Sequence, residues 1–379
     1  MTAHLFVKDI QPSDSSVPVG ATAIASIAEE ITYRGYPLSE LAEHCTFEEV
    51  AQLLLRGELP GLREKNRFEH RLNASRHLPE GLCDLLASLP AWTPPIESLR
   101  TSVSVLAHFD QDAPDQSIEA KLRKAERMLG QIPTAIAWRA RALAGLQPVE
   151  PREGLGHAAQ FLHQLRGKEP QPHEARALEM ALIVFAEHEF NPSTYTARVV
   201  ASTGSDLHSS VVAAICALKG QRHGGFDEEV VRLLVSLEEK ESAGATITRA
   251  DLPTGPIPGF GHPLYPQGDP RAALLEPLTH QALLLVGHSR MAELSTRVCE
   301  HMAAEHGLNP SIEWAVGRLF HALGLDVELF PPVLVMARLV GWSAHHLEQH
   351  ADPKAIRPRA TYKGSPQRPV PPLAERKDI

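Results

Sequence analysis

Apolar residues recur at three- and four-residue intervals along most of this 379-residue chain. That spacing places them on one face of a helix, and no convincing strand pair or hairpin turn competes with it. Only the first thirty or so residues read as an irregular or short-stranded lead-in. The sequence therefore predicts an all-α protein with more than a dozen helices. The helical stretches expected include 38–44, 46–56 with a Thr46/Glu49 capping box at its start, 64–77, 96–108, 117–129, 134–144, 158–165, 174–190, two long helices within 271–306, and 331–350.

The composition of the sequence changes near Gly220 and returns to a strongly apolar helical pattern after Leu325. Between these points lie the Gly- and Pro-rich loops, a polar segment and two long helical stretches. Such a shift and return predicts a smaller domain, 220–325, inserted into a larger one formed by 1–219 and 326–379, with a cleft between them. The Pro- and Arg-rich residues 350–379 are either a tail or an arm that wraps a neighbouring subunit, and composition favours the tail.

The segment GFGHPLYPQGDPR, residues 259–271, contains three glycines and three prolines and cannot be regular structure. It carries His262 and Arg271 on either side of a turn. Asp269 followed by Pro270 is typical of a helix start, which puts Arg271 in the first turn, where a cation is electrostatically unfavourable. A loop with a solvated arginine is the simpler alternative.

Two further arginines stand in unusual settings. Arg338 lies in PPVLVMARLVGW, a helical stretch that is apolar nearly all round and hence expected to be buried. A buried guanidinium must face either a carboxylate of the protein or an anionic ligand. Arg357, in AIRPRATY, reads alone as a solvated charge. With Arg271 these cations suit a ligand with two carboxylates.

Two histidines and one glutamate complete the candidate set. His188 ends a helical stretch in FAEHEFNPST, where capping the helix is the alternative role. His223 lies among glycines in KGQRHGGFDEE, just before a helix whose backbone donors favour a neutral imidazole. Glu313 is flanked by apolar residues in NPSIEWAVGRLF, and an ordinary first-turn acid is its alternative.

Taken together, these groups predict carbon–carbon bond formation from a thioester. A carboxylate can remove a proton next to a thioester carbonyl, one imidazole can hold the enol oxygen, and a second can polarise the carbonyl under attack. The arginines would hold a dicarboxylate electrophile. The sequence contains no nucleophile elbow, P-loop or Rossmann turn.

Charge and composition exclude several other classes. The net charge of −9 and a pI near 6.1 argue against nucleic acid or an anionic membrane as partner. Four widely separated cysteines favour reduced thiols and a cytoplasmic protein. The most apolar run, 331–340, is too short to span a bilayer. We expect no metal site, because the twenty histidines are scattered and no Cys-x-x-Cys pair occurs.

Over nearly its whole length the chain resembles the citrate synthase family. The blocks that carry the resemblance, in the order of the family, are TYRGYPLSELAEHCTFEEVAQLLLRGELP, SLRTSVSVLAHFD, AEHEFNPSTYTARVVASTGSDLHSSVVAAICALKGQRHGG, GFGHPLYPQGDPR, ELFPPVLVMARLVGWSAHHLEQ and IRPRATY. The resemblance implies an all-α homodimer with a large and a small domain that close over the substrates. It also implies condensation of an acyl-CoA with oxaloacetate to a tricarboxylate and free CoA. Acyl-CoA is then a substrate, and no cofactor or metal is required.

The resemblance also implies a role for each candidate residue. His223 matches the histidine that stabilises the enol, and His262 the one bonded to the oxaloacetate carbonyl. The remaining matches are His188, Arg271 and Arg338 as oxaloacetate ligands and Arg357 as an arginine contributed across the dimer.

Glu313 aligns with the catalytic aspartate of the family, and this is the main departure. The longer side chain reaches about 1.5 Å further, and misplacement on that scale costs roughly 100-fold in rate unless the helix shifts to compensate. We hypothesise that Glu313 remains the base. Relatives also have HGGAN and GHRVYK where this chain has HGGFD and GHPLYP. Arg222, Arg318 or residues elsewhere must therefore contact the phosphates of CoA.

The wording AEHEFN and TGSD, the proline after His262 and the tryptophan after Glu313 are similar to the 2-methylcitrate synthase branch. The branch implies propionyl-CoA as acyl donor and a place in propionate metabolism. One methylene is worth only about 1–3 kcal/mol of discrimination, so both acyl donors remain open. The alternatives are a citrate synthase of the tricarboxylic acid cycle that uses acetyl-CoA only, cleavage of a citryl thioester, and an inactive paralogue that binds oxaloacetate.

Overall fold

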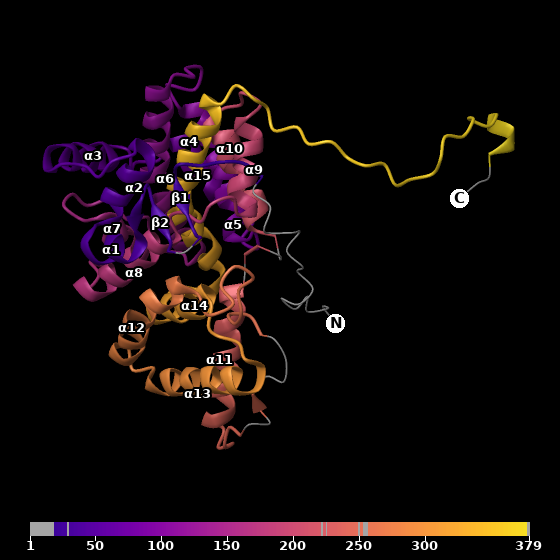
Figure 1. The fold of residues 1–379 in the computed structure, drawn as a ribbon. Helices are drawn as coiled ribbons and strands as arrows, with labels where there is room; N and C mark the ends of the chain where they lie inside the picture. The colour runs from indigo at the N-terminus through magenta and orange to yellow at the C-terminus, as the bar shows by residue number, and fades with distance from the viewer. Residues whose placement is uncertain are drawn as a thin grey trace.

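The computed structural model describes residues 19–28, 30–220, 223–224, 226–248, 251–252 and 257–376. Its architecture is all-α, as the sequence predicts, with fifteen α-helices and one small sheet among these residues (Figure 1). The helices are α1 Leu38–His44, α2 Phe47–Arg56, α3 Leu62–Ala74, α4 Glu80–Ser88, α5 Pro95–Phe109, α6 Ile118–Leu143, α7 His157–Arg166, α8 Pro172–Phe185, α9 Pro192–Ala201, α10 Leu207–Leu218, α11 Phe226–Ser242, α12 Pro270–Leu285, α13 Ser289–His306, α14 Ile312–Ala322 and α15 Phe330–Ala351.

Three two-residue strands precede the helices: β1 Ala25–Ser26, β2 Thr32–Tyr33 and β3 Tyr36–Pro37, all antiparallel. The β2–β3 turn places Arg34 and Gly35 at φ 52° and 87°. Two consecutive left-handed residues are typical of a tight hairpin, which the sequence analysis did not foresee. The turn brings the buried Tyr33 hydroxyl within 3.2 Å of the Ile183, Val184 and Glu187 carbonyl oxygens. The small sheet therefore fixes the end of α8.

Several helix boundaries differ from the sequence prediction for physical reasons. Helix α6 runs unbroken through Pro133, although proline lacks the amide donor. It is buried along most of its length, and packing against α5, α7 and α15 compensates for that loss. Helix α8 ends at Phe185 and not at residue 190, so His188 lies beyond its end. The prediction that His188 ends a helix is wrong by these few residues. The Thr46–Glu49 capping box is confirmed.

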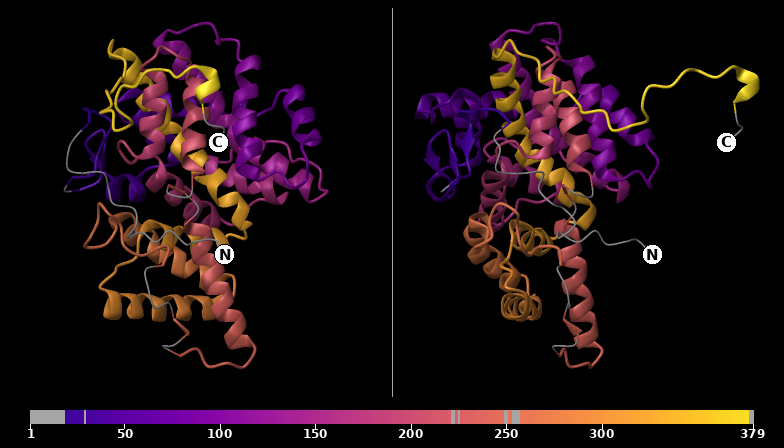
Figure 2. Two further views of the ribbon diagram at one scale, coloured as in Figure 1. Left: turned by 90° about the vertical axis from the view of Figure 1, so that its right-hand side faces the viewer. Right: turned by 45° about the vertical axis from the view of Figure 1, so that its right-hand side comes forward.

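Helices α11–α14 gather at one end of the molecule, and most of the remaining helices form a larger bundle at the other (Figures 1 and 2). Helix α14 packs against α11 and α12, while α12 and α14 both contact α8 of the larger bundle. The division into domains at residues 220 and 325 stays a prediction. Beyond α15 the chain leaves the body as an extended segment (Figure 1).

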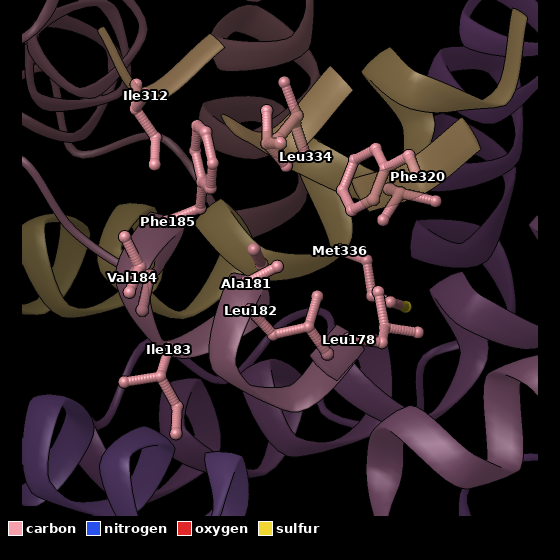
Figure 3. Packing of buried hydrophobic residues seen from close by; sticks show 14 of the residues in the cluster. Leu178, Ala181, Leu182, Ile183, Val184, Phe185, Ile312, Phe320, Leu334 and Met336 are labelled. Carbon is pink, nitrogen blue, oxygen red and sulfur yellow. The ribbon is translucent and has the colours of Figure 1, made fainter. Parts of the chain in front are cut away.

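Helix α15 is part of the hydrophobic core. It contacts α2, α5, α6, α8, α9 and α10, and Figure 3 shows part of the buried cluster that it forms with α8 and α14. The apolar stretch Val327–Ala351 is longer than the run considered in the sequence analysis. By length and mean hydropathy, 1.3, it could cross a membrane, but 78% of the apolar window is buried inside the protein. It therefore reads as a core helix.

The approach of α15 to the segment after α8 yields a stability prediction. A Cβ at Gly341 would overlap Oε2 of Glu187 and the carbonyl oxygen of Ala186. Gly341→Ala should therefore lower the free energy of unfolding by about 2–3 kcal/mol, as overpacking of a rigid core does. Urea unfolding of the variant and the unmodified protein measures this difference.

Gly61→Ala is the matched control, because nothing lies within 4 Å of a Cβ added there and its φ of −73° suits any residue. It should cost less than about 1 kcal/mol. Equal stability of Gly341→Ala and the unmodified protein would contradict the packing described here.

Candidate active site

The loop 259–269 carries His262 to the start of α14. Gly259, Gly261 and Gly268 have φ of 87°, 73° and 115°, which favour glycine. A Cβ on Gly259 would also lie only 2.7 Å from Val230 and 3.2 Å from Trp314. The backbone of the loop pairs with the residues before α14: Gly261 N–H donates to the Asn309 oxygen at 2.9 Å, and Ser311 N–H to the Gly259 oxygen at 2.9 Å. These bonds place His262 next to the helix turn that carries Glu313.

Helix α12 begins at Pro270 with Asp269 as its N-cap, as the helix-start signature predicts, and Asp269 also forms a buried ion pair with Arg271. Asp269 is the N-cap and accepts the backbone N–H of Arg271 at 3.0 Å. Its two oxygens also accept from Nε and Nη2 of Arg271, at 3.0 and 2.7 Å. Although burial alone would lower the pKa of Arg271, this carboxylate raises it above the usual value. The unfavourable cation in the first turn is thereby compensated.

His188 and His262 meet around Tyr265. The Tyr265 hydroxyl lies 2.7 Å from Nε2 of His188, and its ring stacks on His262 at 4.8 Å between centroids. The two imidazole rings are 5.9 Å apart. Burial, followed by the charges of Arg271 and Arg338, holds the pKa of His188 well below its usual value.

Burial and the positive charge of Arg271 also lower the pKa of His262, while the Glu313 carboxylate acts in the opposite direction. Nδ1 of His262 accepts the Leu264 N–H at 3.2 Å. In the neutral ring the proton therefore resides on Nε2, which can donate to a ligand.

His223 is held at the N-terminus of α9. Its Nε2 accepts the Ser193 N–H at 3.2 Å and lies 2.8 Å from the Ser193 hydroxyl. That hydroxyl also accepts from Nε1 of Trp342 at 3.2 Å. Burial and the charge of Arg338 lower the pKa of His223 to about 4. The ring is neutral at pH 7 with its proton on Nδ1, as a donor to an enol oxygen requires.

Arg338 is buried, and its Nε donates to the carbonyl oxygen of Phe185 at 2.7 Å. Among the described residues no carboxylate oxygen lies within 4.0 Å of its guanidinium, so it makes no ion pair with them. The alternative of a carboxylate in direct contact is therefore not observed. A buried cation of this kind favours an anionic ligand.

Glu313 lies half-buried in the first turn of α14, and its Oε2 accepts the Ser311 hydroxyl at 2.5 Å. Its negative charge acts on His262, Arg271 and Arg338. The structure therefore brings the carboxylate, three histidines and two arginines together. It does not bring Arg357 there, which is exposed in the extended C-terminal segment.

Four contributors to this cluster were not predicted from the sequence: Tyr265, Ser193, Trp342 and the carboxylate of Asp269 as a partner of Arg271. Tyr265 and Asp269 lie in the very segment that was singled out, but their role depends on which side chains fold against them.

Arg318 is not available for the phosphates of CoA, and that suggestion is wrong. It is buried, pairs with Glu276 and donates to the Trp314 carbonyl oxygen at 2.8 Å. Arg222 lies outside the described residues. The described part of the chain holds no group of three or more His, Cys, Asp and Glu placed to bind a metal ion. His346 and His350 are four residues apart on a helix, a spacing that can bind a metal ion and that was not noted from the sequence. Nδ1 of His346, however, is hydrogen-bonded to the Ser210 hydroxyl at 2.8 Å.

Comparison with known proteins shows the family of the chain. The family model described as citrate synthase, C-terminal domain, matches residues 14–359. The chain is 38% identical to citrate synthase 2 of Bacillus subtilis over 357 residues, 94% of this chain and 96% of that one. It is 37% identical to 2-methylcitrate synthase of Mycobacterium tuberculosis over 366 residues, 96% of this chain and 93% of that one. The chain belongs to the citrate synthase family.

Solved structures agree with the fold. The citrate synthase of Pyrobaculum aerophilum, 34% identical, superposes with a TM-score of 0.85 over 95% of this chain and 94% of that one. The Thermoplasma acidophilum citrate synthase, 24% identical, shares the fold with a TM-score of 0.84 over 95% of this chain and 97% of that one, and was solved as a ternary complex with carboxymethyl coenzyme A and oxaloacetate.

The burial of His223 predicts a dependence of stability on pH. Its pKa is 6.5 in an exposed setting and about 4 in the fold, so between these values only the unfolded chain binds the proton. The free energy of unfolding should therefore fall as pH falls through this window, by on the order of 2 kcal/mol at pH 5 for this one group. Above pH 7 the contribution is constant.

His223→Gln removes the titrating group, so urea unfolding at pH 7 and pH 5 should show a smaller pH dependence in the variant. Other buried histidines remain in both proteins and cancel in this comparison. Titration of the His223 imidazole by NMR gives a direct check, and a midpoint near 6.5 would refute the assignment.

Proposed function

We propose that this protein condenses a short acyl-CoA with oxaloacetate, giving a tricarboxylate and free CoA. The observation that carries the proposal is the pair of neutral imidazoles, His223 and His262, with their donor nitrogens defined by backbone bonds. Beside them lies the buried Arg338, which makes no ion pair within the described part of the chain. Membership of the citrate synthase family supports the same reaction. The solved ternary complex of the related Thermoplasma enzyme contains oxaloacetate and carboxymethyl coenzyme A.

In the proposed mechanism Glu313 removes a proton from the carbon next to the thioester carbonyl. Nδ1–H of His223 donates to the enol oxygen that forms, and Nε2–H of His262 polarises the ketone of oxaloacetate. The enol carbon attacks that ketone. Water then cleaves the thioester, so acyl-CoA, oxaloacetate and water give the tricarboxylate and CoA. Arg271, Arg338 and His188 hold the carboxylates of oxaloacetate.

We further propose propionyl-CoA as the preferred donor, on the wording of the motifs shared with the 2-methylcitrate synthase branch. Relatives of both names match at nearly equal identity, and one methylene contributes only about 1–3 kcal/mol to discrimination. Acetyl-CoA is the second candidate donor. No resident cofactor is proposed, and acyl-CoA is treated as a substrate. A cytoplasmic location is likewise proposed, which the four free cysteines suit.

The assembly proposed is a homodimer in which Arg357 reaches the site of the other subunit. In the single chain Arg357 is exposed and lies in a segment that extends away from the helices (Figure 1). An extended segment with few contacts to its own chain fits an arm better than the tail suggested by composition. The site of a single chain would then lack one of the arginines that bind the carboxylates of oxaloacetate.

Release of the CoA thiol in the presence of saturating oxaloacetate tests the reaction. We expect thiol from both acyl donors, with the larger kcat/KM for propionyl-CoA. Glu313→Gln should lower kcat at least 100-fold, because it removes the base and leaves the ligands of oxaloacetate in place. Undiminished turnover of this variant would show that Glu313 is not the base.

Glu293→Gln on the exposed face of α13 is the matched control and should keep the activity of the unmodified protein. Oxaloacetate binding without thiol release from either donor would favour the inactive paralogue. Thiol ester cleavage of a citryl-CoA without condensation would favour the lyase alternative.

The role of Arg357 is tested by Arg357→Gln, which should raise KM for oxaloacetate about tenfold or more and leave the mass of the assembly unchanged. The mass is measured by light scattering. Mixed dimers of Arg357→Gln with Glu313→Gln chains should regain activity only if one subunit completes the site of the other. A monomeric protein with full activity would rule out the arm.

A further inference from the structure

Glu187 stands next to the candidate site but belongs to none of the roles assigned above. It follows α8, directly precedes His188, and its side chain is fully buried. Oε1 accepts Nε2–H of His345 at 3.0 Å, while Oε2 has no hydrogen-bond partner among the residues that the structure describes. A buried carboxylate oxygen without a partner is costly, so the charge of Glu187 needs an explanation.

The partner on α15 does not neutralise that charge. Nδ1 of His345 lies 2.9 Å from Nη1 of Arg198, which can only donate, so the single proton of the neutral ring is on Nε2. Arg198 in turn forms its ion pair with Glu348 at 2.5 Å. His345 therefore gives Glu187 a hydrogen bond but no positive charge, and the charge of Arg198 is balanced elsewhere.

Arg338 of α15 is a buried cation that makes no ion pair with a carboxylate among the described residues. Arg338, Gly341 and His345 follow one another at three- and four-residue steps and so share one face of α15. Arg338 donates to the Phe185 oxygen, Gly341 lies against Glu187, and His345 bonds Glu187. Both charges are thus anchored on the short segment 185–188. Burial lowers the pKa of Arg338, and Glu187 is the largest opposing influence.

We propose that Glu187 is the internal counter-ion of Arg338, a positioning residue that acts through the charge of the guanidinium and sets the affinity for the dicarboxylate substrate. The inference rests on the proposed function, in that the ligand is taken to be oxaloacetate. Glu187 is near enough to stabilise the cation, yet makes no direct ion pair, which leaves the guanidinium nitrogens available. The carboxylate of the substrate then supplies the direct contact.

A change of Glu187 should affect oxaloacetate binding in the opposite direction from a change of a residue with only a structural role. Glu187 repels the incoming dianion through the same field that stabilises Arg338. Removal of its charge should therefore tighten oxaloacetate binding and at the same time destabilise the empty protein. A residue with only a structural role would weaken binding when it is changed.

Isothermal calorimetry of the full-length protein with oxaloacetate tests the inference. Glu187→Gln retains an acceptor for His345 and should lower the Kd about tenfold, the scale expected from one buried charge several ångströms away. Glu348→Gln is the control: it removes the carboxylate that pairs with Arg198 in the same hydrogen-bond network, and it should change the Kd less than twofold. Unchanged or weaker binding by Glu187→Gln would overturn the proposal.

A double-mutant cycle covers the case in which Glu187→Gln does not fold. Arg338→Met alone leaves Glu187 as a buried charge without its cation, whereas Arg338→Met with Glu187→Gln removes both charges. Urea unfolding should show the double variant to be more stable than Arg338→Met. The reverse order would overturn the counter-ion role. Absence of oxaloacetate binding to the unmodified protein would refute the proposed function, while this cycle would still test the pairing.

Discussion

The carboxylate of Asp269 is the contact on which the rest of the site depends. It caps α12, pairs through both oxygens with the guanidinium of Arg271, and accepts the backbone N–H of Ile312 at the start of α14. One buried group therefore fixes the cation, the loop before it and the helix that carries Glu313. The field of that cation in turn lowers the pKa of both His188 and His262. Loss of this carboxylate would leave a buried guanidinium unpaired and unlink two helices at once.

The charges of the site are arranged so that each imidazole is neutral and oriented. Burial is the first cause for all three histidines, and the two arginines add to it. Backbone amides orient two of the rings, since Ser193 N–H donates to His223 and Leu264 N–H donates to His262, whereas His188 meets the Tyr265 hydroxyl. Backbone donors cannot titrate, so the tautomers of His223 and His262 do not depend on the ionisation of a neighbouring side chain.

Local sequence features predicted much of this structure. The helix periodicity, the Asp269–Pro270 helix start and the irregular loop before it could be predicted from the sequence because each depends on nearby residues. The burial of Arg338 could be predicted from the apolar residues around it. Other features were not: the hairpin that fixes α8, the continuity of α6 through Pro133 and the pairing of Arg318 with Glu276 depend on residues far apart in sequence. Arg318 looked available because nothing near it in the chain reveals that Glu276 folds against it.

The segment 185–188 is held from both directions along the chain. The Tyr33 hydroxyl contacts the Glu187 carbonyl oxygen from 154 residues upstream, and Arg338 contacts the Phe185 carbonyl oxygen from 153 residues downstream. Contacts of such long range form only after the intervening chain has collapsed. During synthesis the segment 185–188 therefore lacks its contacts with α15 until that helix has left the ribosome. A nascent chain that ends before that helix lacks Arg338 and leaves the apolar end of α8 without its partner, so the site is completed only in the last steps of translation.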